Sequence, residues 1–189
     1  MKNNKVIYII IAVLVLMVIG GGLFFFFSNK GSQKEAQSQR PGEFSNGQQY
    51  ATFKTDDFEV KYPNWPNIDR SKIAEADKYE VAVSNEGCNF IIKVASVPPN
   101  TSFREYEENL FQEQIKQFPA KILIKDIKDT TAYFEGEVSI GNTIVKSISH
   151  SYFTSKGQSV GFAFVAQNDQ FERVCRPIID EVVRSVKVK

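Results

Sequence analysis

Hydrophobic and polar residues divide the chain into three zones. The first zone, Val6–Phe27, is a run of 22 residues without a charged side chain. A helix of this length extends about 33 Å and the hydrocarbon core of a bilayer is about 30 Å thick, so the run predicts a transmembrane helix. The second zone, Ser28–Gln49, is polar apart from Phe44 and predicts a flexible linker. The third zone, residues 50–189, has the periodic patterns of a folded domain.

The apolar run has the properties of an uncleaved signal anchor. A cleavable signal peptide has an apolar core of about 7–15 residues and a small-x-small cleavage site, whereas this run is longer and ends in Phe24–Phe27. It lacks the early glutamate of a type IV pilin and the following cysteine of a lipoprotein. The charges on its two sides nearly balance, so its orientation is inferred from the usual behaviour of N-terminal anchors. We expect residues 1–5 to be a cytoplasmic tail and residues 50–189 to be an extracytoplasmic domain of a single-pass membrane protein.

The first part of the domain predicts two pairs of strands. Apolar Phe58, Val60 and Tyr62 alternate with charged residues, which is the pattern of a half-buried strand. Gly87 follows a turn-prone Asn-Glu pair and favours a hairpin. The strands predicted here are Tyr50–Lys54, Phe58–Tyr62, Lys78–Ser84 and Asn89–Val97.

The middle of the domain predicts a helix. Ser102 and Glu105 form a capping box at its start, and Pro119 marks its end. One face of this segment is apolar at helical spacing, with Phe103, Tyr106, Leu110, Phe111, Ile115 and Phe118. We interpret this stripe as the surface that packs against a sheet.

Four strands and a second helix complete the domain. The strands are predicted at Lys121–Lys128, Thr131–Ile140, Thr143–Thr154 and Gln158–Gln167, joined by tight turns as an antiparallel meander. Asp169–Val186 has one apolar stripe and predicts a helix, which Pro177 should kink or split near Val174. Helices packed on an antiparallel sheet make a layered domain of the α+β class.

These elements resemble the PsbP-like family, which is named for an extrinsic subunit of photosystem II. The resemblance rests on Phe58-x-Val-x-Tyr-Pro63 with Trp65, on Thr101-Ser102-Phe103 at the start of the middle helix, and on the ending Val183-Arg-Ser-Val186. It implies an antiparallel β-sheet with helices packed on both faces, an α-β-α sandwich. It implies no catalytic residue, because members of the family occur as photosystem accessory factors and as uncharacterised prokaryotic envelope proteins.

The charge balance argues against a nucleic-acid partner. The chain has 23 Lys and Arg residues and 22 Asp and Glu residues. Lys2 and Lys5 precede the apolar run, so the part of the chain beyond it is nearly neutral. A nucleic-acid-binding protein would show a basic excess or a basic face.

Cys88 and Cys175 are the two cysteines of the chain. Their spacing matches no zinc pattern, and the single histidine supplies too few further ligands for a metal site. An even number of cysteines in an oxidising compartment favours a disulfide, and two unrelated buried thiols are the alternative. We therefore predict a Cys88–Cys175 disulfide, no metal and no cofactor.

One short motif resembles the active site of a serine hydrolase. Gly157-Gln-Ser159-Val-Gly161 matches the G-x-S-x-G nucleophile elbow, but that elbow joins a strand to a helix and its histidine follows in the chain. Here the motif falls in a predicted hairpin, and His150 precedes it. We therefore interpret the motif around Ser159 as a chance match in a hairpin turn that runs into a strand, and His150 as a core or half-buried residue of a strand.

Tyr62 and Trp65 are the candidate interaction surface, because two prolines flank the tryptophan at the end of a hairpin. Packing of these rings into the core is the alternative. From the anchor, the neutral domain and the missing chemistry, we expect a non-enzymatic, membrane-anchored module that binds or helps to assemble another envelope component. The alternatives are a small-ligand-binding domain with a pocket between sheet and helix and, less favoured, a serine hydrolase that uses Ser159 with His150.

Overall fold

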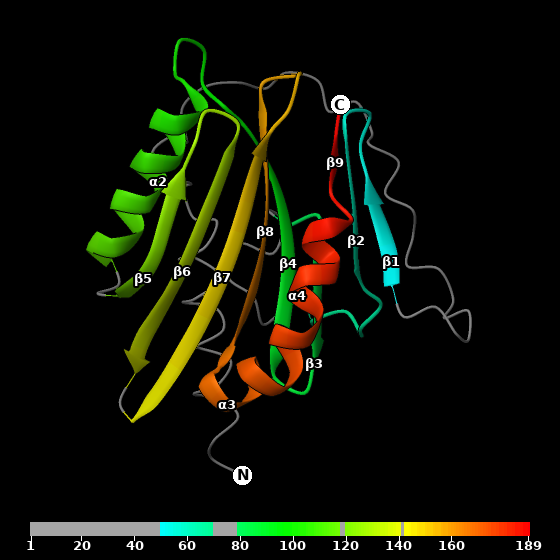
Figure 1. Cartoon of the computed structure of the whole chain (residues 1–189), viewed down its shortest axis with the longest axis vertical. Coiled ribbons are helices and arrows are strands. Elements are labelled where there is room, and N and C mark those ends of the chain that lie inside the picture. Colours follow the sequence, from blue (N-terminus) through cyan, green and yellow to red (C-terminus); the bar gives the residue numbers. More distant parts are fainter. Residues whose placement is uncertain (1–49, 70–78, 118–119, 141) are drawn as a thin grey trace.

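The computed structural model describes residues 50–69, 79–117, 120–140 and 142–189. The predicted anchor Val6–Phe27 and the predicted linker Ser28–Gln49 lie outside these ranges. Within the ranges, no helix is long and apolar enough to cross a membrane. The described residues form an α+β domain with a large antiparallel sheet, a small antiparallel sheet and two main helices (Figure 1).

The large sheet has six strands in the order β3-β4-β8-β7-β6-β5. These are β3 (Val81–Asn85), β4 (Cys88–Ser96), β5 (Lys121–Ile127), β6 (Thr131–Ile140), β7 (Thr143–Phe153) and β8 (Gln158–Gln167). All neighbouring strands are antiparallel. The predicted meander is therefore confirmed, and pairing of β8 with β4 joins it to the preceding hairpin.

Residues with positive φ make the tight turns of this sheet. Glu86 (φ 45°) and Gly87 (φ 84°) lie between β3 and β4, and two successive positive φ values are the geometry of a type I′ hairpin. Gly157 (φ 72°) lies in the turn between β7 and β8. Both turns are at the glycines where the sequence predicts them.

The small sheet corrects the sequence prediction of a single sheet. Its order is β1-β2-β9, and its first two strands are the predicted hairpin of β1 (Tyr50–Lys54) and β2 (Phe58–Pro63). The third strand, β9 (Lys187–Val188), pairs with the start of β2. A strand of two residues has too little alternation to be recognised, and the sequence pattern extends the last helix almost up to it.

That last helix ends at Arg184, two residues before its predicted end at Val186. Ser185 follows, and its hydroxyl donates to the carbonyl oxygen of Val182 (2.6 Å). The same hydroxyl accepts the backbone N–H of Lys61 in β2 (2.8 Å). The serine thus satisfies a terminal carbonyl of the helix and ties the helix end to the small sheet.

The C-terminal helical segment has three parts. These are α3 (Asn168–Gln170), a π-helical turn η3 (Phe171–Cys175) and α4 (Arg176–Arg184). Pro177 lies in the first turn of α4 and has no N–H for the carbonyl group four residues earlier, so a continuous α-helix is unfavourable here. The π-helical turn interrupts the α-helix near Val174, where the sequence predicts a kink or a split.

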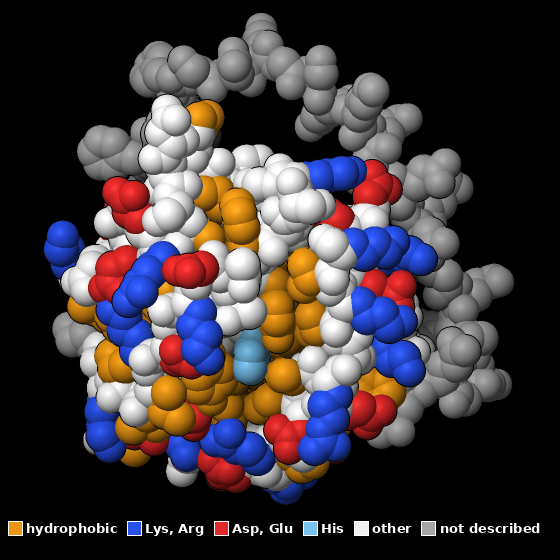
Figure 2. Space-filling view, turned by 45° about the horizontal axis from the view of Figure 1, so that its top comes forward, with side chains coloured by type: hydrophobic (Ala, Val, Ile, Leu, Met, Phe, Trp, Pro, Cys, Tyr) orange, Lys and Arg blue, Asp and Glu red, His pale blue; other side chains and the backbone are white. Residues whose placement is uncertain are grey.

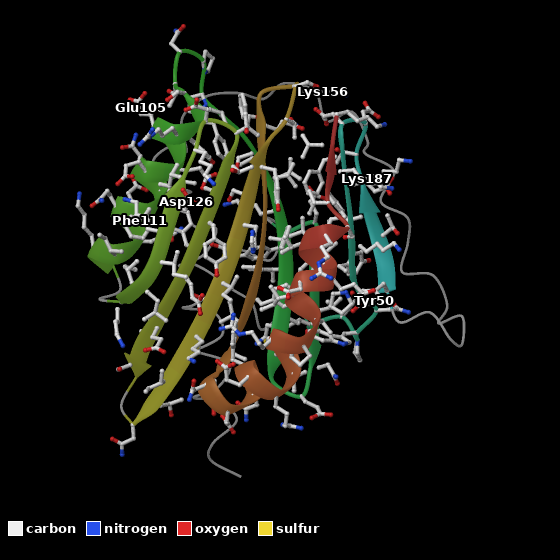
Figure 3. All side chains as sticks on the ribbon, in the orientation of Figure 1. Tyr50, Glu105, Phe111, Asp126, Lys156 and Lys187 are labelled. Carbon is white, nitrogen blue, oxygen red and sulfur yellow. A yellow bond between two sulfur atoms is a disulfide. The ribbon has the colours of Figure 1, made fainter. Side chains whose placement is uncertain are left out.

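Alternation along the strands gives the large sheet two distinct faces. We call the face toward α4 the front face and the face toward α2 (Phe103–Gln117) the back face. Phe162 belongs to the core cluster that includes α4, so it marks the front face. Phe134 has the opposite parity and stacks on Phe111 of α2, with ring centroids 5.0 Å apart. Phe111 is labelled on α2 in Figure 3.

The main core lies between the front face and the layer formed by η3, α4 and the small sheet. Its largest fully buried side chains are Phe58, Phe90, Phe162, Phe164 and Phe171. A disulfide joins Cys88 at the start of β4 to Cys175 in η3, and both cysteines are fully buried. The predicted Cys88–Cys175 disulfide is therefore confirmed.

The start of α2 supports a prediction about stability. We expect Ser102→Ala to lower the free energy of unfolding by about 1 kcal/mol, because Ser102 Oγ accepts the backbone N–H of Glu105 (3.1 Å) as an N-cap. Denaturant unfolding followed by fluorescence of Trp65, the one tryptophan of the chain, measures the change. Ser102→Asn keeps an acceptor and should retain most of the stability. An equal loss in both variants would contradict the capping role.

Candidate functional site

Side chains of the front face differ in exposure along the large sheet. Over β8 and most of β4 they are buried beneath α4 and the small sheet, and Val94 near the end of β4 is partly buried. Over β6 and β7 the corresponding residues Tyr133, His150 and Tyr152 are half-buried. Figure 2 shows the single histidine at the surface among hydrophobic side chains, in a shallow hollow. We call Tyr133, His150 and Tyr152 the aromatic face.

The rings of the aromatic face are in contact with one another and with the core. Tyr133, His150 and Phe162 lie opposite each other on β6, β7 and β8. The His150 ring is 4.8 Å from the Tyr133 ring and 5.3 Å from the Phe162 ring, measured between centroids. The Tyr152 ring lies 6.1 Å from Phe162. The core therefore holds these half-exposed rings in fixed positions.

His150 is an uncharged member of this surface at neutral pH. Burial of the imidazole lowers the pKa of His150 to about 4, because a charged ring would lose hydration among aromatic neighbours. In the part of the chain that the structure describes, the ring has aromatic contacts and no hydrogen bond. Its nitrogens are thus free to donate or accept one hydrogen bond each with a docked partner.

The histidine gives a direct test of this environment. We expect the imidazole resonances of His150 to titrate with a midpoint near pH 4 rather than at the ordinary 6.5. Because the chain has one histidine, proton NMR observes the transition without overlap from a second one. A pKa lowered in the folded state makes this residue stabilising above about pH 6.5, and the contribution is lost as the pH falls toward 4. A midpoint at 6.5 would contradict the buried position.

An ion-pair network borders the aromatic face on the side of α4. Tyr133 Oη donates to Glu135 Oε2 (2.9 Å), and Arg176 Nη2 donates to Glu135 Oε1 (2.9 Å). Glu172 accepts from Lys146 Nζ (2.8 Å). Burial and the neighbouring Glu135 carboxylate raise the pKa of Tyr133 to about 12, so its hydroxyl stays protonated. These bonds join β6 and β7 to the C-terminal helices and fix one edge of the surface.

The back face contains a buried carboxyl group that the sequence reasoning missed. Glu107 of α2 is 4% exposed, and its Oε1 accepts a hydrogen bond from Ser159 Oγ (2.7 Å). Ser151 is a second hydrogen-bond partner. Burial raises the pKa of Glu107, and the two serine hydroxyls partly oppose this effect. The group is a polar link between α2 and the sheet.

A small cavity lies beside this carboxyl group. Its volume is about 20 Å³, and Lys93, Tyr106, Gln114 and Ser149 contribute to its lining. That is room for about one water molecule. Sites for small organic ligands measure about 300–1,000 Å³, so the space under α2 does not fit such a ligand.

The structure does not bring Ser159 and His150 together. Ser159 lies on the back face with Glu107, whereas His150 lies on the front face beside Phe162. The sheet separates the two side chains, and no proton can pass directly between them. The G-x-S-x-G stretch itself lies in the β7–β8 turn and the start of β8, as the sequence predicts.

Comparison with solved structures identifies proteins of similar fold. Cyanobacterial PsbP (CyanoP) from Synechocystis sp. PCC 6803 superposes with a TM-score of 0.55 and 14% identity, over 78% of this chain and 98% of that chain. The fold is PsbP-like. The Ran-binding protein Mog1p of Saccharomyces cerevisiae (TM-score 0.49, 11% identity) covers 74% of this chain and 95% of its own. LpqN, involved in cell envelope biogenesis of Mycobacterium tuberculosis (TM-score 0.40, 8% identity), covers 74% of this chain and 83% of its own.

No family model and no curated protein matches the sequence. At 14% identity the likeness to CyanoP extends to the fold alone. The site of this PsbP-like domain must therefore be argued from its own residues.

Tyr62 and Trp65, the candidate surface from the sequence, are half-buried in the PsbP-like domain. The Tyr62 ring stacks on Phe90 of the core with centroids 6.0 Å apart, and Trp65 packs against the same cluster. Both rings keep an exposed part, so they remain a second candidate surface beside the aromatic face.

The described ranges contain no group of three or more His, Cys, Asp and Glu side chains placed to hold a metal ion.

Glu107 could have been found from the sequence, because it stands four residues from both Phe103 and Phe111 and so falls within the apolar stripe. His150 shares the parity of Tyr152, which identifies their common face. That this half of the face stays open depends on where α4 packs, for which the sequence has no local signal.

Proposed function

We propose that this chain is a membrane-anchored, extracytoplasmic binding module whose PsbP-like domain docks another envelope protein through the aromatic face. The observation that carries the proposal is the half-exposed set of rings at Tyr133, His150 and Tyr152. Tyrosine rings combine a large apolar area with a polar end, and aromatic residues are enriched in the centres of protein interfaces. The core beneath fixes their positions, which lowers the entropy lost on binding.

The proposed location rests on the disulfide and on the apolar run near the N-terminus. Disulfides persist in oxidising compartments and are rare in the cytosol. The buried Cys88–Cys175 bond therefore favours an extracytoplasmic domain. The uncharged run Val6–Phe27 would tether this domain to the membrane, and Ser28–Gln49 would span an average of about 25 Å as a flexible coil.

A protein partner fits the geometry better than the alternatives. The cavity under α2 has about 20 Å³, too little for a small organic ligand. The separation of Ser159 from His150 leaves the serine without a histidine base. We therefore propose a non-enzymatic role.

The test compares tyrosine variants of the full-length chain in its own cell membrane. Cells are treated with a membrane-impermeant crosslinker, and the tagged chain is recovered under denaturing conditions. We expect a discrete crosslinked species with the wild type and its loss in Tyr133→Ala and Tyr152→Ala. Truncation of a tyrosine that is a binding hot spot costs about 2 kcal/mol or more, which is roughly a 30-fold loss of affinity.

Tyr62→Ala is the matched control, because it removes a tyrosine of similar burial from the other candidate surface. The crosslinked species should persist in this variant. Loss in Tyr62→Ala with retention in Tyr133→Ala and Tyr152→Ala would contradict the aromatic face and assign the contact to Tyr62 and Trp65. Thermal unfolding of each variant identifies a loss caused by misfolding.

A further inference from the structure

The loop after β2 lies at the point where the chain enters the described domain. The first residue of the domain is Tyr50 of β1, and its register partner in β2 is Pro63. Residues 64–68 follow directly and lead toward β3, and we call them the tryptophan loop. Figure 1 shows this connection and the start of β1 at the same end of the small sheet, and Figure 3 labels Tyr50 there. The end of the domain that continues into Ser28–Gln49 therefore presents the tryptophan loop.

The tryptophan loop holds apolar side chains at the surface in a fixed conformation. Pro66 is exposed, and Trp65 and Ile68 are half-buried. The backbone N–H of Trp65 donates to the carbonyl oxygen of Pro63 (2.8 Å), and that of Ser84 in β3 donates to the carbonyl oxygen of Pro66 (2.9 Å). Trp65 also packs against the main core. The loop thus keeps part of an indole ring exposed without the freedom of an unstructured segment.

The chemistry of the loop suits the interface between a bilayer and water. Residues 64–68 carry no charged side chain. Lys61 and Asp69, the charged residues that flank the loop, are exposed and of opposite sign, so they give no preference for an anionic surface. An indole ring has an apolar body and a polar N–H, and tryptophan is enriched at membrane–water interfaces. The loop therefore complements the headgroup region of an uncharged bilayer through its rings.

The proposed tether brings this end of the domain to the membrane. A compact domain of this length is about 37 Å across, and the ends of the linker would lie about 25 Å apart on average. Contact through the attachment end thus needs the least extension of the linker. A tether of this kind gives a local concentration in roughly the millimolar range. A contact of only millimolar affinity would therefore be well populated.

A second apolar surface lies far from the attachment point. Ile122, Leu123 and Ile124 of β5 are 39%, 40% and 46% exposed. The tryptophan loop borders β3 through the bridge between Asn67 and Val83, and β3 and β5 are the two opposite edges of the large sheet. With strands about 4.8 Å apart, β5 is about 24 Å from β3. The tether therefore favours the tryptophan loop over the β5 edge.

We infer that the tryptophan loop is a membrane-contact site, which places Trp65 and Pro66 in the headgroup region of the bilayer that holds the anchor. The inference rests on the proposed membrane anchor. It sets the orientation of the domain, with the Tyr50 end toward the lipid. The aromatic face lies on the other side of α4 from the small sheet and stays open to a protein partner (Figure 1).

The test uses the full-length chain in phosphatidylcholine vesicles whose lipids carry bromine in the upper part of their acyl chains. Bromine quenches tryptophan fluorescence at short range, and Trp65 is the one tryptophan of the chain. We expect the chain to float with the vesicles and its fluorescence to be about twofold lower than in unbrominated vesicles, because the ring lies at the interface. High salt should leave the quenching unchanged. Flotation without quenching would overturn the inference and leave the anchor intact, whereas a chain that does not float would overturn both.

A moved reporter shows which surface touches the lipid. Trp65→Phe combined with Leu123→Trp transfers the tryptophan to the exposed β5 edge. We expect quenching of this variant to fall well below that of the wild type. Equal or stronger quenching at position 123 would overturn the inference, because the domain would then contact the bilayer through β5 or without a preferred face.

A matched pair of substitutions in the loop keeps Trp65 as the reporter. Pro66→Asp introduces a charge, and Pro66→Ala removes the same ring without a charge. We expect Pro66→Asp to lose most of the quenching and Pro66→Ala to retain it. Equal quenching in the two variants would contradict insertion of the loop. Thermal unfolding followed by circular dichroism checks that each variant is folded.

Discussion

Replacement of both Cys88 and Cys175 by alanine is expected to lower the free energy of unfolding by about 4 kcal/mol. The two residues are 87 positions apart, so the disulfide closes a long loop and lowers the conformational entropy of the unfolded chain. In the folded domain it fixes η3 to the start of β4. The measurement is denaturant unfolding of the full-length chain in detergent, followed by Trp65 fluorescence.

The wild type in the presence of a thiol reductant is the control for this experiment. If the disulfide acts through loop closure, reduced wild type should approach the stability of the double-alanine variant once the bond is cut. A difference below about 1 kcal/mol between oxidised wild type and the double variant would show that the bond contributes little.

Glu107→Gln is expected to change the pH dependence of stability. Burial raises the pKa of Glu107 above its ordinary value of 4.5, so the folded state binds this proton more tightly than the unfolded chain does. The contribution of Glu107 to the free energy of unfolding is fully present below about pH 4.5, and it is lost as the pH rises through the pKa of the folded state. Each tenfold difference in proton affinity between the two states corresponds to about 1.4 kcal/mol.

Glutamine has a similar shape and cannot ionise, so Glu107→Gln should gain stability relative to the wild type as the pH rises from 4 to 9. Unfolding at several pH values measures the difference. His150 changes the stability with pH in the opposite direction. Because His150 is present in both the wild type and Glu107→Gln, its effect cancels in the difference between them. Glu113→Gln is the matched control, because Glu113 is an exposed glutamate of the same helix. Parallel pH profiles for Glu107→Gln and the wild type would contradict the raised pKa of Glu107.

Local patterns predicted most of the fold. The strands from β5 to β8 lie within one residue of their predicted bounds, because alternation over seven or more residues is a strong signal. Ser102 marks the start of α2, and Pro177 marks the interruption of the C-terminal α-helix by a π-helical turn, because each acts on its own backbone neighbours. In contrast, β9 has two residues and forms through pairing with β2, far away in the chain. Such pairings have no local signal.

The candidate site was less predictable than the fold. The parity of His150 and Tyr152 was evident, but exposure of that face depends on how α4 and the small sheet pack. The burial of Glu107 follows from helical spacing, whereas its partners Ser151 and Ser159 come from strands that only the sheet register brings together. The same register explains why Ser159 and His150, nine positions apart, lie on opposite faces.

Site-specific photocrosslinking tests the central claim most directly. A photoreactive amino acid is placed singly at Tyr133, at Tyr152 and at Asn109, an exposed position on α2 of the opposite face. The full-length chain is irradiated in its own cell membrane. The proposal predicts one discrete envelope protein crosslinked from positions 133 and 152 and none from position 109. Crosslinks of equal yield from all three positions, or none from 133 and 152, would contradict docking through the aromatic face.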